Sequence, residues 1–261
     1  MSDIGLIYKI IIYIIIIMNN NLDFLIVYNS EHTKIRVGSK NDGGYVICDN
    51  IDYNILLSCG ISNDITFEDD FTTKYNVNCF AYDGTIEKLP HYNNNKINFI
   101  KKNISAYESD KTTNMLDIIN NNDNIFLKMD IETWEYEWIK NLSKDHINKF
   151  KQIVIEFHFP FTYSEEIFKS FSYPLEINDK INCLKTLAET HYLVHFHGNN
   201  VCGTTIYNNI KVPNVFECTY IRKDLCNNIS KNIHKIPSIL DTPNIDKDDI
   251  ELEGYPFTFN F

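Results

Sequence analysis

Carboxylate and imidazole side chains follow four apolar segments of this sequence, in a pattern that could build one chemical site. One segment ends in a single acid and three end in pairs of polar residues spaced two apart: Asp83, Asp130 and Glu132, Glu156 and His158, and His195 and His197. Side chains two apart on a strand share a face, and open α/β sheets bind ligands beyond the carboxyl ends of their strands. We therefore expect these residues to meet at one sheet edge, although any single pair would also fit a solvated strand end.

Histidine titrates near neutral pH and is therefore the natural general base of such a site. We expect His158, beside Glu156, to be that base, with Asp130 and Glu132 near the reacting centre and His195 as a further catalytic candidate. A second hypothesis is that the three acids and a histidine together bind Mg²⁺ or Mn²⁺, which prefer oxygen ligands. We prefer the base over the metal and assign no metal ligand.

The segment SCGISND, which closes the apolar run 54–60, has the features of a ligand-binding turn. Gly60 lets the backbone turn tightly, and we expect Asp64 to cap a helix whose first N–H groups face a polar ligand. Asp83 ends the next apolar run, about 20 residues later, where a carboxylate can accept hydrogen bonds from both hydroxyls of a ribose. The sequence has no G-x-G-x-x-G, which argues against a pyrophosphate cofactor and suits a nucleoside cofactor without phosphate.

Two further features each allow two interpretations. The run Asp42-Gly43-Gly44-Tyr45 is either a tight turn into a strand or a loop that folds over the cofactor, with the tyrosine in contact. Trp134 and Trp138 share one helix face and are expected to pack into the sheet, with sugar stacking as the alternative for the first.

Strand-like and helix-like segments alternate along the chain, which predicts a largely parallel sheet with helices on both faces. The last two strands have room only for a loop between them and should pair antiparallel. The expected strands are 43–48, 54–60, 77–83, 97–105, 124–132, 151–159, 192–198 and 214–223, with 24–28 a strand or a helix end. The expected helices are 64–76, 112–122, 134–142, the IFKSF segment and 177–190.

Composition restricts the class of protein. The chain has 261 residues, 44% of them hydrophobic, and a net charge of −11, so it can fill a core and its surface repels the phosphates of nucleic acids. None of the seven cysteines forms a C-x-x-C pair, which indicates mostly buried, free thiols in a reducing compartment such as the cytoplasm.

The first 21 residues stand apart from the rest. Residues 4–18 are very apolar but short for a membrane span and interrupted by Lys9. The segment is either a membrane anchor or lies upstream of a translation start at Met18. We expect a cytoplasmic protein, with membrane anchoring through this segment as the alternative. Residues 22–261 are expected to form a single domain with a loop-rich C-terminal tail.

Five motifs occur in a recognisable order: GSKNDGGYVI, LLSCGISNDITFEDDF, CFAYDGTI, FLKMDIETWEYEWI and IVIEFH. Together, over about 35–225, they resemble the FkbM-like S-adenosylmethionine-dependent methyltransferases. The resemblance implies the Rossmann-like class I methyltransferase fold, with a mostly parallel seven-stranded sheet, one antiparallel edge strand and helices on both faces. It also implies methylation of hydroxyl groups on sugars or small metabolites. The family usually has Gly where this chain has Thr133, so the turn there is expected to differ, because a β-branched residue resists positive φ.

The same resemblance implies roles for individual residues. Gly60 and its loop would lie against the methionine part of the cofactor, Asp83 would hold the ribose, Ser105 would lie near the adenine and Asp130 near the reacting centre. The alternatives are a non-catalytic binding protein of this fold and a metal-dependent hydrolase that uses the same acids and histidines. The partner is expected to be a small molecule or glycan, and the sequence makes no prediction of oligomeric state.

Overall fold

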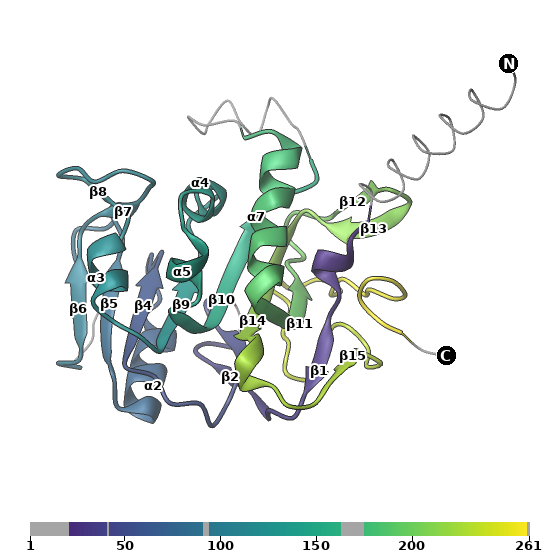
Figure 1. The fold of residues 1–261 in the computed structure, drawn as a ribbon, viewed down its shortest axis with the longest axis horizontal. Coiled ribbons are helices and arrows are strands. Elements are labelled where there is room, and N and C mark those ends of the chain that lie inside the picture. The colour runs from purple at the N-terminus through teal and green to yellow at the C-terminus, as the bar shows by residue number, and fades with distance from the viewer. Residues whose placement is uncertain (1–20, 41, 91–93, 163–174, 260–261) are drawn as a thin grey trace, which may run out of the picture.

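The computed structural model describes residues 21–40, 42–90, 94–162 and 175–259, built around a seven-stranded sheet (Figure 1). The strand order is β11-β14-β10-β9-β4-β5-β6. The strands are β4 (Ile55–Cys59), β5 (Asn78–Tyr82), β6 (Ile97–Ile100), β9 (Ile125–Met129), β10 (Phe150–His158), β11 (His191–Gly198) and β14 (Val215–Arg222). All four neighbouring pairs in the row β6-β5-β4-β9-β10 are parallel, which confirms the mostly parallel seven-stranded sheet.

The antiparallel strand is not at the edge, however. β14 lies between β10 and β11 and runs antiparallel to both, so the predicted antiparallel pairing of the last two strands is confirmed and the edge position is corrected. Seven of the eight residues of β14 are buried, which requires a neighbour on each side. The edge strand β11 is bordered in turn by the N-terminal part of the chain, through a bridge between Val27 and Leu193.

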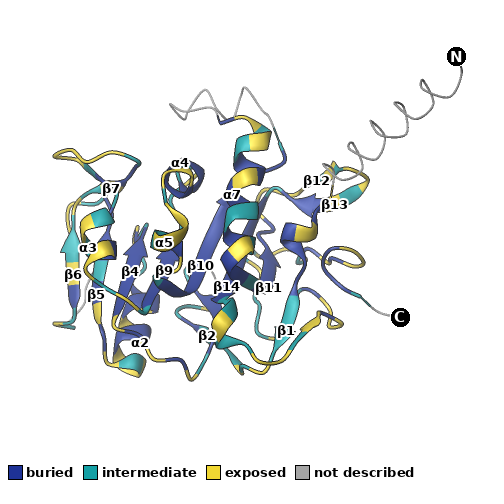
Figure 2. Ribbon diagram, viewed as in Figure 1, coloured by how far each residue is buried: buried dark blue, intermediate teal, exposed yellow. Residues whose placement is uncertain are grey.

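Each sheet face has its own cover, because apolar side chains alternate along the central strands. In β4, Ile55 and Leu57 join the larger core cluster, whereas Leu56 joins the other. The larger cluster lies under α3 (Leu116–Asn120), α4 (Glu135–Lys140), α5 (Lys144–Ile147) and α7 (Ile177–Thr190). The opposite face is covered by α2 (Thr66–Tyr75) and the hairpin of β2 (Lys34–Val37) and β3 (Tyr45–Cys48). The central strands are accordingly buried throughout (Figure 2).

Eight further short elements complete the described fold, and two of them fall within the segments expected at 97–105 and 112–122. They are η1 (Asp23–Leu25), β1 (Tyr28–Ser30), β7 (Asn103–Ile104), β8 (Thr112–Thr113), β12 (Thr204–Tyr207), β13 (Ile210–Pro213), η2 (Lys223–Leu225) and β15 (Ile229–Lys231). The loop expected between the last two strands contains the β12–β13 hairpin, and the strand expected at 97–105 is divided into β6 and β7. β15, in the tail, pairs with β1, which ties the tail to the start of the described chain.

The cysteines, the IFKSF segment and residues 4–18 were also the subject of predictions. All seven cysteines are free and five of them are buried, as predicted. The IFKSF segment and residues 4–18 lie outside the described residues, within which no helix has the length and apolarity to cross a bilayer.

Candidate active site

A pocket of about 680 Å³ opens at the carboxyl ends of β4, β5 and β9. Its size suits a small-molecule ligand. Nine of the predicted site residues line it: Asp42, Gly43, Tyr45, Gly60, Asp64, Asp83, Ser105, Asp130 and Glu132. Gly44, His158 and His195 do not line it, so the sequence predicted most of the wall but not every residue around it.

Gly60 allows the ends of two neighbouring strands to meet. Its φ is +79°, and a Cβ added there would lie 1.6 Å from the carbonyl oxygen of Asp130. The backbone N–H of Asp130 donates to the carbonyl of Cys59 at 2.9 Å, so the two chain segments stay in contact just past the sheet. No side chain fits at position 60 without separating them.

Asp83 holds the loop after β4 in place. Its Oδ2 accepts the backbone N–H groups of Ile61 and Ser62 at 2.9 and 2.8 Å, and its Oδ1 accepts the backbone N–H and hydroxyl of Thr85 at 2.7 and 2.6 Å. Burial raises the pKa of this carboxyl, but these four donors outweigh burial and lower it below its usual value. The carboxylate therefore already has four donors, and a ribose would have to share its lone pairs with them.

The turn between β2 and β3 is both tight and part of the pocket. Gly43 has φ +93°, and a Cβ on Gly44 would lie 1.9 Å from the carbonyl oxygen of Ser39. Tyr45, which follows, is buried and donates its hydroxyl to Asp130 Oδ2 at 3.3 Å. The tight-turn interpretation and the cofactor-loop interpretation of residues 42–45 are therefore compatible, because the turn places Tyr45 in the pocket wall.

Asp64 and Ser105 both line the pocket. Asp64 accepts the backbone N–H of Thr66 at 2.8 Å, but the residue that precedes the first helical residue of α2 is Ile65, so the predicted cap lies one residue too early. The backbone N–H of Ser105 donates to the carbonyl of Thr113 at 3.0 Å, which fixes the wall beyond β7.

Four carboxylates surround the imidazole of His158. Its Nε2 lies 3.8, 3.4 and 3.6 Å from oxygens of Asp130, Glu132 and Glu156, and its Nδ1 lies 3.4 Å from Glu135 Oε1. Burial lowers the pKa of this imidazole, but the carboxylates, Glu135 first, outweigh burial and raise it to about 10. In the unliganded protein the ring is therefore protonated at neutral pH, and it cannot act as the predicted base until that proton is lost.

A row of polar side chains extends from this cluster across the sheet. Glu156 pairs with Glu217 of β14, which in turn pairs with His197 of β11. Burial, and then the charge of Asp130, raise the pKa of Glu156 well above its usual value. Asn199 donates to Glu156 Oε1 at 2.8 Å. The row makes this end of the site strongly acidic.

The two histidines of β11 are held by the C-terminal tail. His195 Nε2 lies 2.8 Å from Asp241 Oδ1, and His197 Nε2 lies 3.0 Å from Asp249 Oδ2. Although burial opposes ionisation of Asp241, the charge of His195 lowers the pKa of this acid to about 2. His195 does not line the pocket and has a bonding partner in the tail, and its catalytic role stays a prediction.

The turn after β9 is strained. Glu132 and Thr133 have φ values of +53° and +81°, a region that costs a β-branched residue free energy. Thr133 therefore has a positive φ although its side chain is β-branched, and the expectation that this turn differs from that of the family stays a prediction. Beyond it, Trp138 is buried and donates its Nε1–H to the carbonyl of Asn114 at 2.8 Å, whereas Trp134 lines the pocket, so only one of the two tryptophans packs as predicted.

Sequence reasoning missed Lys128 and Glu135. Lys128 lines the pocket, donates to the carbonyl of Gly60 at 2.5 Å and lies 3.9 Å from the buried Glu68. Glu135 is fully buried in α4 and accepts the backbone N–H of His158 at 2.8 Å. A lysine inside an apolar strand was a usable signal, whereas an acid in an amphipathic helix looks like a surface residue.

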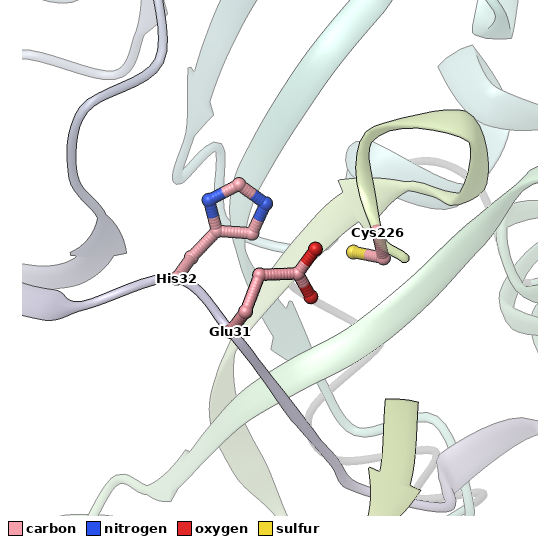
Figure 3. A group of neighbouring side chains, drawn as sticks. All are labelled: Glu31, His32 and Cys226. Carbon is pink, nitrogen blue, oxygen red and sulfur yellow. The ribbon is translucent and has the colours of Figure 1, made fainter. Parts of the chain in front are cut away.

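A second group of potential metal ligands lies away from the pocket, at Glu31, His32 and Cys226 (Figure 3). Glu31 accepts the backbone N–H groups of Asn227 and Asn228 at 2.8 and 3.2 Å, and His32 Nε2 is 2.9 Å from the carbonyl of Leu225. Burial raises the pKa of the Cys226 thiol to about 11, which keeps it protonated. These groups join two loops and are already in use.

The sheet, with its antiparallel penultimate strand and a ligand-sized pocket at the carboxyl edge, has the Rossmann-like class I methyltransferase fold. The sequence profile described as "Methyltransferase FkbM domain" matches residues 29–193, and the chain belongs to this family of methyltransferases. Among solved structures, the chain is similar to a precorrin-6y C5,15-methyltransferase from Geobacter metallireducens GS-15. The identity is 9%, the match covers 67% of this chain and 84% of that chain, and the TM-score is 0.34. No curated protein matches the chain.

Proposed function

We propose that this methyltransferase moves a methyl group from S-adenosylmethionine to a hydroxyl group of a sugar or small metabolite. The observation that carries the proposal is the pocket itself, which brings the Gly60 loop, Asp83, Ser105 and Asp130 together within the FkbM domain. Its strand-end position is where open α/β sheets bind ligands.

The donor would lie along the wall formed by β4, β5 and the segment after β7. The loop at Gly60 would contact the methionine part, Asp83 would face the ribose, and Ser105 would lie near the adenine. Tyr45, with its hydroxyl on Asp130, would close the opposite side. Bound S-adenosylmethionine supplies an electrophilic methyl group on a sulfonium; the protein has to bind it, orient it and exclude water.

The acceptor end carries the acidic residues. Asp42, Asp130 and Glu132 line the pocket, and Lys128 is the one basic side chain among the described residues that line it. That lysine is already bonded to the Gly60 carbonyl. A phosphate or carboxylate on the acceptor would be repelled here, whereas the hydroxyls of a sugar can donate to carboxylates. We therefore propose a neutral or cationic small molecule or glycan as the acceptor, and no nucleic acid.

Two measurements test the proposal. Titration calorimetry should show that S-adenosylhomocysteine binds the chain, and a screen of neutral and cationic sugars and small alcohols should find acceptors to which S-adenosylmethionine transfers its methyl group. Binding without turnover on any acceptor would favour the non-catalytic alternative. A folded protein that binds neither S-adenosylhomocysteine nor S-adenosylmethionine would overturn the proposal and favour the hydrolase.

The place of action is proposed on the thiols. Seven free cysteines, five of them buried, support a reducing compartment such as the cytoplasm. Fractionation of cells that express the full chain tests this, with recovery in the membrane fraction as the contrary outcome.

A further inference from the structure

We propose that Asp130, Glu156 and His158 form a binding site for one divalent metal ion, with Mn²⁺ as the matched ion. The site adjoins the pocket, which Asp130 lines and Glu156 and His158 do not. Metal binding itself stands independently, whereas the metal's role in methyl transfer rests on the function proposed above.

The three side chains converge from two neighbouring strands. Asp130 follows β9, and Glu156 and His158 lie on one face at the end of β10. One oxygen of each acid and one nitrogen of the ring lie within 4.8 Å of one another. A cation placed among ligand atoms at such separations can reach all three with small side-chain movements, since metal–ligand distances are about 2.0–2.2 Å.

The inward-facing atoms are buried without good partners. His158 is 5% exposed, and its Nε2 lies 3.4–3.8 Å from three carboxylates, beyond the usual hydrogen-bond distance. The Oδ1 atom of Asp130 is buried and has no hydrogen-bond partner. Leaving such atoms unpaired in a protein interior costs free energy, and a cation among them would satisfy all of them together.

The outward-facing atom of each ligand is oriented by a neighbour. Tyr45 donates to Asp130 Oδ2 at 3.3 Å, which leaves Oδ1 toward the imidazole. Asn199 donates to Glu156 Oε1 at 2.8 Å, which leaves Oε2.

The imidazole also has a carboxylate behind it, although its Nδ1 makes no hydrogen bond in the structure. Glu135 Oε1 lies 3.4 Å from His158 Nδ1 and accepts the backbone N–H of the same residue at 2.8 Å. A carboxylate behind a histidine is the usual support of a metal-ligating imidazole. A cluster of acids on a protein surface has no such second layer of orienting groups, so the arrangement points to a ligand.

The donor set selects the metal. Two carboxylates and one imidazole suit Mn²⁺, which accepts both oxygen and nitrogen ligands, better than Mg²⁺, which prefers oxygen alone. The site offers no thiolate, since the ligands are limited to oxygen and nitrogen. Three protein ligands leave coordination positions for water and for the acceptor hydroxyl.

A metal ion bound here would lower the pKa of an acceptor hydroxyl that it coordinates, which gives that hydroxyl a route to deprotonation. The bound hydroxyl would lose its proton to the carboxylate of Glu132, which lines the pocket. A lone pair of the resulting alkoxide oxygen would then form the new bond to the methyl carbon. The methyl–sulfur bond breaks with its electron pair left on sulfur, and the products are a methyl ether, S-adenosylhomocysteine and a protonated Glu132 that returns its proton to water.

The direct test measures metal on the full chain after dialysis against EDTA. Calorimetry and metal analysis with Mn²⁺ alone should find one ion per chain. Glu156→Gln and His158→Gln should each weaken Mn²⁺ binding at least tenfold, and Asn199→Ala, which keeps all three ligands, should weaken it by about 10–100-fold. His32→Ala, in the second group of potential ligands, is the matched control and should bind Mn²⁺ like the wild type.

Outcomes that overturn the proposal are separate from those that overturn the function. The proposed metal site would be refuted if the folded wild type does not bind Mn²⁺. It would also be refuted if His32→Ala loses Mn²⁺ binding while the other variants keep it. S-adenosylhomocysteine affinity, measured in EDTA, reports the cofactor pocket alone. Turnover that persists unchanged in EDTA would also refute the metal's role while leaving the proposed methyltransferase function intact.

Discussion

Replacing Asp83 by asparagine should both destabilise the fold and weaken cofactor binding. The carboxylate accepts four hydrogen bonds, from Ile61, Ser62 and twice from Thr85, at 2.6–2.9 Å. An amide has one oxygen, so in either orientation its NH₂ group would face two donors. Two bonds to a charged group, at roughly 1.5–3 kcal/mol each, are lost, and water from the pocket compensates in part. We expect the free energy of unfolding to fall by about 2–4 kcal/mol.

The assay is thermal unfolding of Asp83→Asn and wild type over a range of pH. For a chain of this size the loss corresponds to a fall in Tm of roughly 5–15 °C at pH 7. Because the pKa of Asp83 is lowered in the folded state, its stabilisation is present above the pKa of an unfolded aspartate and is lost as pH falls through the folded value. The difference between the two proteins should therefore shrink at acidic pH.

Cofactor affinity tests the second role of the same residue. If the ribose shares this carboxylate, S-adenosylhomocysteine should bind Asp83→Asn about 10–100-fold more weakly. Thr85→Val removes one of the four donors, leaves the carboxylate in place, and should cost about 1 kcal/mol of stability with little change in affinity. A folded Asp83→Asn protein with wild-type stability would refute the role of Asp83 in holding the loop after β4. Unchanged affinity for S-adenosylhomocysteine would refute the assignment of Asp83 to the ribose.

Three other substitutions test the surroundings of the pocket. Thr133→Gly should raise the free energy of unfolding by about 1 kcal/mol, because Thr133 has φ +81°; a fall in the denaturant midpoint would contradict the strain. Gly60→Ala should destabilise severely and abolish S-adenosylhomocysteine binding, since its Cβ would lie 1.6 Å from the Asp130 carbonyl; a stable variant with normal affinity would show that the strand ends can separate. Asp241→Asn should lose about 2 kcal/mol at pH 7, because the pKa of Asp241 is lowered to about 2 beside His195. That contribution is complete above the unfolded pKa near 4 and disappears as pH falls toward 2, so a stability difference that stays constant in acid would refute the ion pair.

Local pattern determined the parts of this protein that depend on neighbouring residues. The alternation of apolar segments and the turn residues at Gly60 predicted β4, β5 and β10 to within one residue at each end, whereas the strand expected at 124–132 ends three residues earlier, at Met129. The helix at 177–190 was predicted with its observed bounds. Strand-end acids were found in the same way, because residues two apart share a face whatever lies around them. The motif order identified the family before any contact was known.

Only the tertiary structure decided what those residues face. The sequence has no signal that pairs His195 with Asp241, 46 positions away, or that places β14 between β10 and β11. The protonation of His158 depends on the buried Glu135, which arrives from a helix 23 residues earlier. Periodicity is a property of one segment, whereas burial, neighbouring charges and hydrogen bonds arise between segments. These decide whether an acid or an imidazole acts as a base, holds a loop in place or binds a metal ion.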